Sequence, residues 1–273
     1  MGCASDSNCP AGACVAGGCS AHLTAWDGGV TVPAELSCEP WPPPTAYGQP
    51  LATLSGCLVA LPGDQLGPAG KVVGDGGPTV QPFEDGFAIG PARPVVAESP
   101  ASCPSGLGYS IDVPVGQPFE VVVSGAAQGW SSTENAALAL DPVREASQAR
   151  RDLGVLSASG WSRLAAALGS DGGETLAAGI VRDCAGAPLS GAALEITGTD
   201  GGGRVAFLGV DGAFEAGRGA TERSGLFALA IPPGGVLVEI AGSAADGGTL
   251  LAAVPLQATV GGSAWIDPAP SGH

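Results

Sequence analysis

The chain of 273 residues has very little histidine, the side chain that many enzymes use as a general base or metal ligand. It contains two histidines, His22 and His273. This scarcity argues against a Ser-His-Asp triad, an H-E-x-x-H zinc motif and a His-rich metal site. The sequence also has no G-x-S-x-G elbow and no phosphate-binding P-loop. We therefore predict no catalytic residue, no cofactor-binding residue and no metal ligand, and we expect a protein that is not an enzyme.

Positive charge is also scarce, because Lys71 is the only lysine and the arginines are scattered along the chain. With 26 acidic residues the formal net charge is −16. No basic stripe exists to neutralise the phosphates of a nucleic acid, so we expect no nucleic-acid partner. No apolar run approaches the roughly 18 residues that a membrane-spanning helix needs, and we expect no transmembrane segment.

Glycine, proline and short apolar runs dominate what is present. The 46 glycines and 24 prolines favour many short strands and turns over long helices. A hydrophobic content of 45% suffices for packed cores, and the length allows two domains of about 100 residues or more. Seven Asp-Gly pairs lack the density of a calcium loop and are interpreted as turns, although weak surface calcium binding stays open.

Eight cysteines favour disulfide bonds and an oxidising compartment, because their number is even and histidine partners for a metal are nearly absent. The disulfide candidates are Cys3, Cys9, Cys14, Cys19, Cys38, Cys57, Cys103 and Cys184. The first four lie in residues 1–22, where we predict two disulfides with three connectivities open. This spacing resembles small Cys-rich modules at the N-termini of bacterial surface proteins. A four-thiolate zinc site is the alternative, but its usual C-x2-C pairs are absent.

Cys184 stands apart from the other cysteines. We predict that it forms a disulfide with Cys38, Cys57 or Cys103, because such a bridge would lock the two predicted domains together. A reactive thiol is the alternative, but it would need a positive or helix-terminal setting, and Arg182 and Asp183 nearly cancel.

Cys3 is also a candidate for lipidation. Gly2-Cys3 matches the last two positions of a bacterial lipoprotein box. No apolar signal segment is visible ahead of it, so we expect either that a signal was removed or that the native start differs. A lipid on Cys3 would leave an odd number of cysteines to pair, yet a lipid anchor stays open.

The stretch from Thr221 to Gly242 has the clearest strand pattern in the chain. Residues 226–231 and 236–241 are alternating apolar runs, and Pro-Pro-Gly-Gly between them predicts a tight turn. We expect a hairpin-like pair with one face in a core and Phe227 buried between sheets. Residues 109–114 and the segment after them repeat this order, which predicts a second copy of the unit.

Between the two copies the spacing changes to that of a helix. The Asp-Pro pair at 141–142 is suited to a helix start, and the polar residues after it can form a solvated helix. An apolar stripe from Trp161 to Leu168 then follows helical spacing, and Gly169 is placed to end it. We therefore predict a helical connector over residues 141–172.

Residues 174–268 carry a more specific motif. The pattern G-x-V-x-D-x-x-G-x-P-L-x-G-A-x-L runs from Gly179 to Leu194, and T-E-x-x-G-x-F follows from Thr221 to Phe227, before Pro-Pro-Gly. This pattern resembles the carboxypeptidase regulatory-like family, whose fold is similar to the seven-stranded, transthyretin-like (prealbumin-like) Greek-key sandwich. The resemblance covers these residues well and residues 51–140 only in their later half.

The resemblance implies a domain without activity of its own, which accompanies peptidases or surface proteins as a stabilising or binding module. Intradiol dioxygenases look similar in part of the same motif, but that family binds iron with two Tyr and two His. Here Tyr47 and Tyr109 have no H-x-H partner, so we set that enzyme aside.

The predicted fold class is therefore all-β: two prealbumin-like Greek-key β-sandwiches joined by a short helical connector. The predicted segments are a Cys-rich disulfide module over 1–22, a Pro-rich lead-in over 23–50, a first sandwich over 51–140, the connector over 141–172 and a second sandwich over 173–270. We expect a secreted or surface-anchored bacterial protein, extracellular or on the outer cell surface, that binds a protein or glycan in a structural or adhesive role. The alternative is an accessory subunit that stabilises a separate secreted hydrolase or peptidase.

Overall fold

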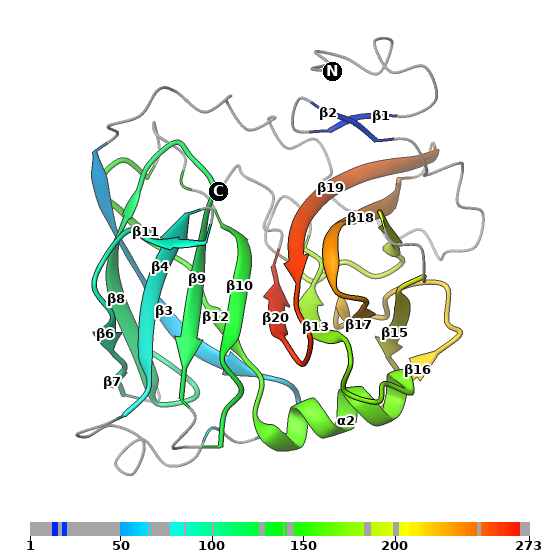
Figure 1. Ribbon diagram of the computed structural model, residues 1–273, viewed down its shortest axis with the longest axis horizontal. Coiled ribbons are helices and arrows are strands. Elements are labelled where there is room, and N and C mark those ends of the chain that lie inside the picture. Colours follow the sequence, from blue (N-terminus) through cyan, green and yellow to red (C-terminus); the bar gives the residue numbers. More distant parts are fainter. Residues whose placement is uncertain are drawn as a thin grey trace. The chain divides into compact units, whose positions relative to one another are not determined.

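Figure 1 shows the computed structural model of the chain, which is built mostly of β-strands. It describes residues 13–15, 18–20, 50–64, 66, 77–84, 86–99, 101–125, 129–138, 140, 145–182, 187–198, 202–244 and 247–267. The chain divides into two compact units, and each is described by itself. We call Pro44–Ala166 with Gly262–Ile266 unit A, and Met1–Pro43, Ala167–Gly261 and Asp267–His273 unit B.

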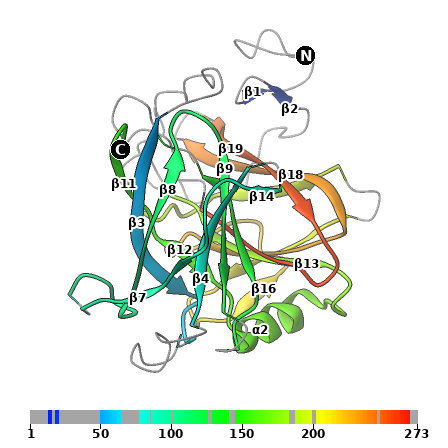
Figure 2. The same cartoon turned by 60° about the vertical axis from the view of Figure 1, so that its left-hand side comes forward.

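The first sheet of unit A is built around the long strand β3 (Leu51–Ala60). On one edge β3 pairs antiparallel with β8 (Leu107–Pro114), which pairs in turn with β7 (Val96–Ala97). Figure 2 shows β3 and β8 running side by side. On its other edge β3 pairs parallel with β11 (Gln148–Arg150) and then with β12 (Leu153–Val155).

The second sheet of unit A has the strand order β20-β10-β9-β4-β5, and β6 also pairs with β4. Its strands are β4 (Thr79–Glu84), β5 (Phe87–Ala88), β6 (Arg93–Pro94), β9 (Phe119–Ser124), β10 (Thr133–Leu138) and β20 (Ser263–Ile266). All neighbours are antiparallel except β10 and β20, which run parallel.

The two sheets of unit A enclose one apolar core. In β9, Phe119, Val121 and Val123 are buried while the residues between them are partly exposed. The period of two is that of a strand with one face against a core. Tyr109 and Ile111 in β8 belong to the same core cluster.

One strand of unit A comes from the far end of the sequence. The chain leaves unit A at Ala166 and returns at Gly262. All four residues of β20 are buried, and they pair with β10 at four consecutive positions. The sequence prediction had placed these residues in the second sandwich, whereas the structure groups them with unit A.

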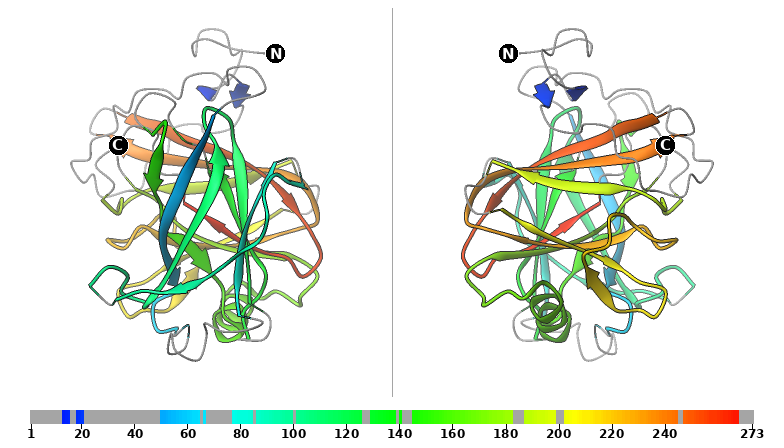
Figure 3. Two further views of the ribbon diagram at one scale, coloured as in Figure 1. Left: turned by 90° about the vertical axis from the view of Figure 1, so that its left-hand side faces the viewer. Right: turned by 90° about the vertical axis from the view of Figure 1, so that its right-hand side faces the viewer.

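Unit B also contains two sheets, and the long orange and red strands in the right-hand view of Figure 3 both belong to the second of them. In spatial order, the first consists of β16 (Phe214–Ala216), β15 (Arg204–Leu208), β17 (Leu226–Ile231) and β13 (Thr175–Ile180). The second consists of β14 (Ala193–Thr197), β18 (Gly234–Ala244) and β19 (Gly247–Ala258). A short antiparallel pair, β1 (Ala13–Val15) and β2 (Gly18–Ser20), forms a sheet of its own.

The stretch from Thr221 to Gly242 forms two strands as predicted, but they are not a hairpin. β17 pairs with β13 and β15, whereas β18 pairs with β14 and β19. The chain crosses between the sheets at Pro232 and Pro233, which have no N–H to donate to a ladder. The predicted burial of one face and of Phe227 is confirmed, and the other face is buried as well, because all six residues of β17 are buried. β8 and β9 likewise lie in different sheets of unit A.

Within residues 141–172, the segment predicted to be a helical connector, the structure has a helix in the second half. α2 (Ala158–Leu168) begins after Ser157, whose Oγ accepts a hydrogen bond from the Gly160 N–H at 2.9 Å, and Gly169 follows its end with φ of 65°. Ser157 is therefore the N-cap of α2, and Gly169 terminates the helix. The polar segment predicted to be helical instead contributes β11 and β12, because pairing with β3 outweighs local helix propensity. The Asp-Pro pair at 141–142 lies outside the described residues.

Candidate functional site

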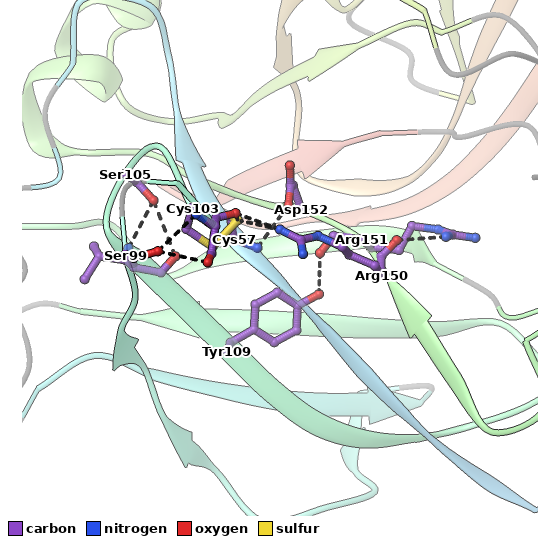
Figure 4. The surroundings of a disulfide bond; sticks show 10 residues. Cys57, Ser99, Cys103, Ser105, Tyr109, Arg150, Arg151 and Asp152 are labelled. Atoms are coloured by element: carbon purple, nitrogen blue, oxygen red, sulfur yellow. Dashed lines mark hydrogen bonds between the residues drawn. A yellow bond between two sulfur atoms is a disulfide. The ribbon is translucent and has the colours of Figure 1, made fainter.

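Cys57 and Cys103 form a disulfide bond in unit A (Figure 4). Cys57 lies in β3, and Cys103 lies in the loop that precedes β8. Their Cα atoms are 5.3 Å apart, and the residues are 2% and 3% exposed. The bond therefore ties a connecting loop to the central strand of the first sheet, and it confirms two of the eight disulfide candidates.

Polar groups from β11 and the residue before β12 surround this disulfide. Arg150 Nη2 donates to the Ser102 carbonyl oxygen at 2.8 Å and lies 3.4 Å from Cys57 Sγ. The Cys57 N–H donates to Asp152 Oδ1 at 3.0 Å. A cation and a carboxylate thus bracket the bond, and each also fixes the backbone next to one of the cysteines.

Tyr109 closes the other side of the same region. Its hydroxyl donates to the Arg151 carbonyl oxygen at 2.7 Å. Burial raises the pKa of the Tyr109 hydroxyl well above its ordinary value, and the negative charge of Asp152 raises it further. Gly56 allows β3 to lie close to the backbone at Arg151, because a Cβ at position 56 would overlap the Arg151 carbonyl. Tyr109 is therefore a neutral donor that fastens β8 to the turn between β11 and β12.

This geometry suits a structural bond rather than an exchanging one. Thiol–disulfide exchange needs a thiolate to reach one sulfur atom, and both Cys57 and Cys103 are buried. Arg150, Asp152 and Tyr109 also make their hydrogen bonds to backbone atoms of unit A. The cluster can stabilise the fold and hold the loop around Cys103 in place.

The disulfide corrects part of the prediction for Cys184. Cys57 and Cys103 are bonded to each other, so neither can be the partner of Cys184. Cys38 is the remaining partner of the three predicted, and both Cys38 and Cys184 lie outside the described residues. Cys3 and Cys9 also lie outside them, whether as disulfide or lipidation candidates. The backbone register of β1 and β2 places Cys14 opposite Cys19.

A buried polar clamp in unit A has no counterpart in the sequence prediction. The side-chain amide of Asn135 in β10 bonds both backbone groups of Gly154 in β12: Oδ1 accepts the N–H at 2.7 Å, and Nδ2 donates to the carbonyl oxygen at 3.2 Å. Thr133 Oγ1 accepts the Leu156 N–H at 3.1 Å. We call Thr133, Asn135 and Gly154 the strand clamp. It joins the two sheets of unit A where backbone pairing stops.

Trp265 of β20 lies directly against the strand clamp. It stands opposite Asn135 in the parallel ladder, and a Cβ at Gly154 would overlap its indole ring. The residue is 4% exposed, and its Nε1–H has no hydrogen-bond acceptor among the residues that the structure describes. The contact of Trp265 is therefore one of shape and apolar burial, and it requires glycine at position 154.

The motif that resembles the carboxypeptidase regulatory-like family lies largely inside unit B. Thr221 Oγ1 donates to the Leu189 carbonyl oxygen at 2.7 Å and accepts the Ala192 N–H at 2.9 Å. Gly225 has φ of 66°, and a Cβ there would overlap the Val181 carbonyl. These residues fold two loops against each other. The motif residues are thus required by the local structure of these loops, and Thr221 and Gly225 offer no reactive group.

Other titratable groups in the described residues form no reactive centre. Burial, and then the charge of Glu120, raise the pKa of Glu134 in β10 to about 7. Within the described part of the chain, no group of three His, Cys, Asp or Glu side chains could hold a metal ion. No helix in this part is long and apolar enough to cross a membrane.

Comparison with known proteins finds distant structural likeness only. No family model matches the chain, and no curated protein matches it. The Bacillus anthracis TIE protein is 10% identical with a TM-score of 0.24, and the match covers 80% of this chain and 33% of that one. The major pilin from Streptococcus pyogenes is 8% identical with a TM-score of 0.18, over 81% of this chain and 100% of that one. At these scores the likenesses carry no argument, and the carboxypeptidase regulatory-like assignment stays a prediction.

Four polar residues that stabilise unit A were not singled out from the sequence. Thr133 and Asn135 are polar residues at inward positions of a strand, which is the one sequence signal that could have singled them out. Arg150 and Asp152 lay in a segment predicted to be a solvated helix. Their partners come from β3 and from the loop before β8, so no local pattern could show them.

Proposed function

We propose that this protein is a non-enzymatic scaffold of an oxidising compartment, secreted from or held on the surface of a bacterium, with a structural or adhesive role. The observation that carries the proposal is the buried Cys57–Cys103 disulfide. Bonds of this kind form and persist outside the reducing cytosol, and they stabilise domains that must survive there.

The use of polar side chains supports a scaffold role. Arg150, Asp152, Tyr109 and Asn135 all bond backbone atoms of unit A, and Thr221 does the same in unit B. A binding or catalytic site instead needs polar groups that converge on a free space. Recognition of a protein or glycan would then fall to surface loops and strand edges, as is common for domains with a rigid β-framework.

The location can be tested on intact cells. We expect an antibody against the folded chain to label unpermeabilised cells or to detect the protein in the medium. Maleimide should label Cys57 and Cys103 only after denaturation with reductant. Labelling restricted to permeabilised cells, or free thiols at Cys57 and Cys103 in freshly isolated native protein, would refute the assignment.

The role can be tested with the purified chain, whose Cys57–Cys103 bond is first verified. A glycan array and a pull-down from the native envelope fraction should show saturable binding that is lost after reduction and unfolding. Co-purification with one stoichiometric peptidase would replace the adhesive role by that of an accessory subunit. Turnover of a substrate by the chain alone would contradict the non-enzymatic assignment. Radiolabelled fatty acid tests the lipid anchor at Cys3, with Cys3→Ser as the control.

A further inference from the structure

A short strand from a distant part of the sequence completes unit A. The continuous part of this unit, Pro44–Ala166, ends within α2, and the second sheet of the unit is extended by β20, which follows the Ala167–Gly261 part of unit B in the sequence. β20 is only four residues long and pairs with one edge of β10 in parallel. Such an addition of a short segment to an open edge is a common mode of peptide recognition.

The receiving surface is held in shape by residues of the continuous part alone. Asn135 fixes both backbone groups of Gly154, and Thr133 fixes the Leu156 N–H. Asn135 Nδ2 also lies 3.3 Å from the Val121 carbonyl oxygen of the neighbouring strand. β12 is held on its other edge by β3. None of these bonds involves β20, so the surface does not need the strand in order to form.

The strand has one side chain that selects this surface. Trp265 lies where Gly154 leaves room for an indole ring, and Ser263, Ala264 and Ile266 beside it are also buried. An aromatic side chain in a shaped, desolvated position gives most of the affinity of a short segment. The register is fixed as well, since a shift by one residue would turn Trp265 to the opposite face.

We propose that the β10 edge and the strand clamp form an acceptor site for the segment Gly262–Asp267, and that a second copy of this chain can supply that segment. The link from the end of β19 to β20 comprises Thr259–Gly262 and ends in two glycines, so it can serve as a hinge. Exchange of an identical element makes every contact of the closed form again, between copies. Reciprocal exchange gives a dimer, and one-way exchange gives a chain of molecules. The inference goes beyond the proposed surface role and does not depend on it.

The first test uses a full-length variant whose own strand is weakened. Trp265→Ala leaves the acceptor surface intact and removes the side chain that selects it. We expect a fluorescent peptide with the sequence of residues 262–267 to bind this variant saturably. A peptide with alanine in place of tryptophan should bind at least about tenfold more weakly. The double variant Gly154→Val, Trp265→Ala is the matched control and should not bind, because valine fills the position of the ring.

The second test asks whether copies exchange strands. Gly154→Val leaves the donor strand unchanged and blocks the position of the ring in the acceptor site. Trp265→Ala leaves the acceptor site unchanged and removes the ring from the donor strand. Each variant alone should be monomeric by light scattering, and their mixture should give a mixed oligomer after brief warming. An intact Cys57–Cys103 bond and native circular dichroism establish that each variant is folded. If Gly154→Val does not fold, Gly154→Ala takes its place.

The outcomes are decisive in both directions. Failure of the peptide to bind folded Trp265→Ala, or equal binding of both peptides, would overturn the acceptor site. Peptide binding without mixed oligomers would overturn exchange between copies. Specific binding together with mixed oligomers would establish both parts of the proposal.

Discussion

Replacing Asn135 by alanine tests whether its amide joins the two sheets of unit A. The substitution removes the partner of the Gly154 N–H and of its carbonyl oxygen, at 2.7 and 3.2 Å. Asn135 is 2% exposed, so water cannot readily replace the amide. Each buried backbone group left unpaired costs about 1–3 kcal/mol. We therefore expect Asn135→Ala to lower the free energy of unfolding of unit A by about 2–6 kcal/mol.

The assay is urea-induced unfolding with the disulfide intact, followed by tryptophan fluorescence and circular dichroism. Thr133→Val leaves one N–H, that of Leu156, without its partner, and should cost less than Asn135→Ala. Ser132→Ala is the control. Ser132 is exposed and directly precedes Thr133, so its replacement should change stability by no more than about 0.5 kcal/mol. An Asn135→Ala loss no larger than that of Ser132→Ala would refute the clamp.

Four further predictions follow from the two units. Phe227→Ala should cost about 3–5 kcal/mol because the ring is fully buried, and a loss under about 1 kcal/mol would contradict its placement. Serine at both Cys57 and Cys103, 46 positions apart, should lower the unfolding free energy of unit A by about 4 kcal/mol, and reductant should then have no further effect on the stability of unit A. Since the pKa of Glu134 rises from 4.5 to about 7, its folded form holds a proton that the unfolded form loses, so stability should fall as pH rises through this window. Glu134→Gln should flatten that slope in urea titrations at several pH values, and an unchanged slope would exclude Glu134 as its source. Trp265→Phe should cost less than Trp265→Ala in melting temperature, because the indole N–H has no acceptor to lose.

Some features of the structure follow directly from local sequence. The apolar stripe that ends at Leu168, with Gly169 after it, predicts a helix where α2 lies, because its spacing and its terminator are both local signals. The alternation in β9 predicts a strand with one buried face. The even number of cysteines predicts disulfides, although the pairing of Cys57 with Cys103 depends on how the loop folds back.

Other features depend on partners distant in the sequence. Gln148–Arg150 has a polar, helix-compatible sequence, but it forms β11 because β3 offers it an edge. The Pro-Pro pair after Ile231 marks a break correctly, yet it cannot show whether the chain returns to the same sheet or crosses to the other. Position 154 reads as a glycine in a loop, and only the Trp265 ring explains why no other residue fits there.

The position of β20 also orders the folding of unit A. β10 ends at Leu138, but its parallel partner begins at Ser263, so among the described strands this edge has no partner until synthesis has passed Ser263. An open strand edge is a template for pairing with other chains, and long-range pairs of this kind form late. The part of unit B from Ala167 to Gly261 is therefore made while the acceptor surface of unit A is exposed. The interval in which β20 is missing is also the one in which a strand from another copy can take its place, so the feature that completes unit A is the feature that permits exchange.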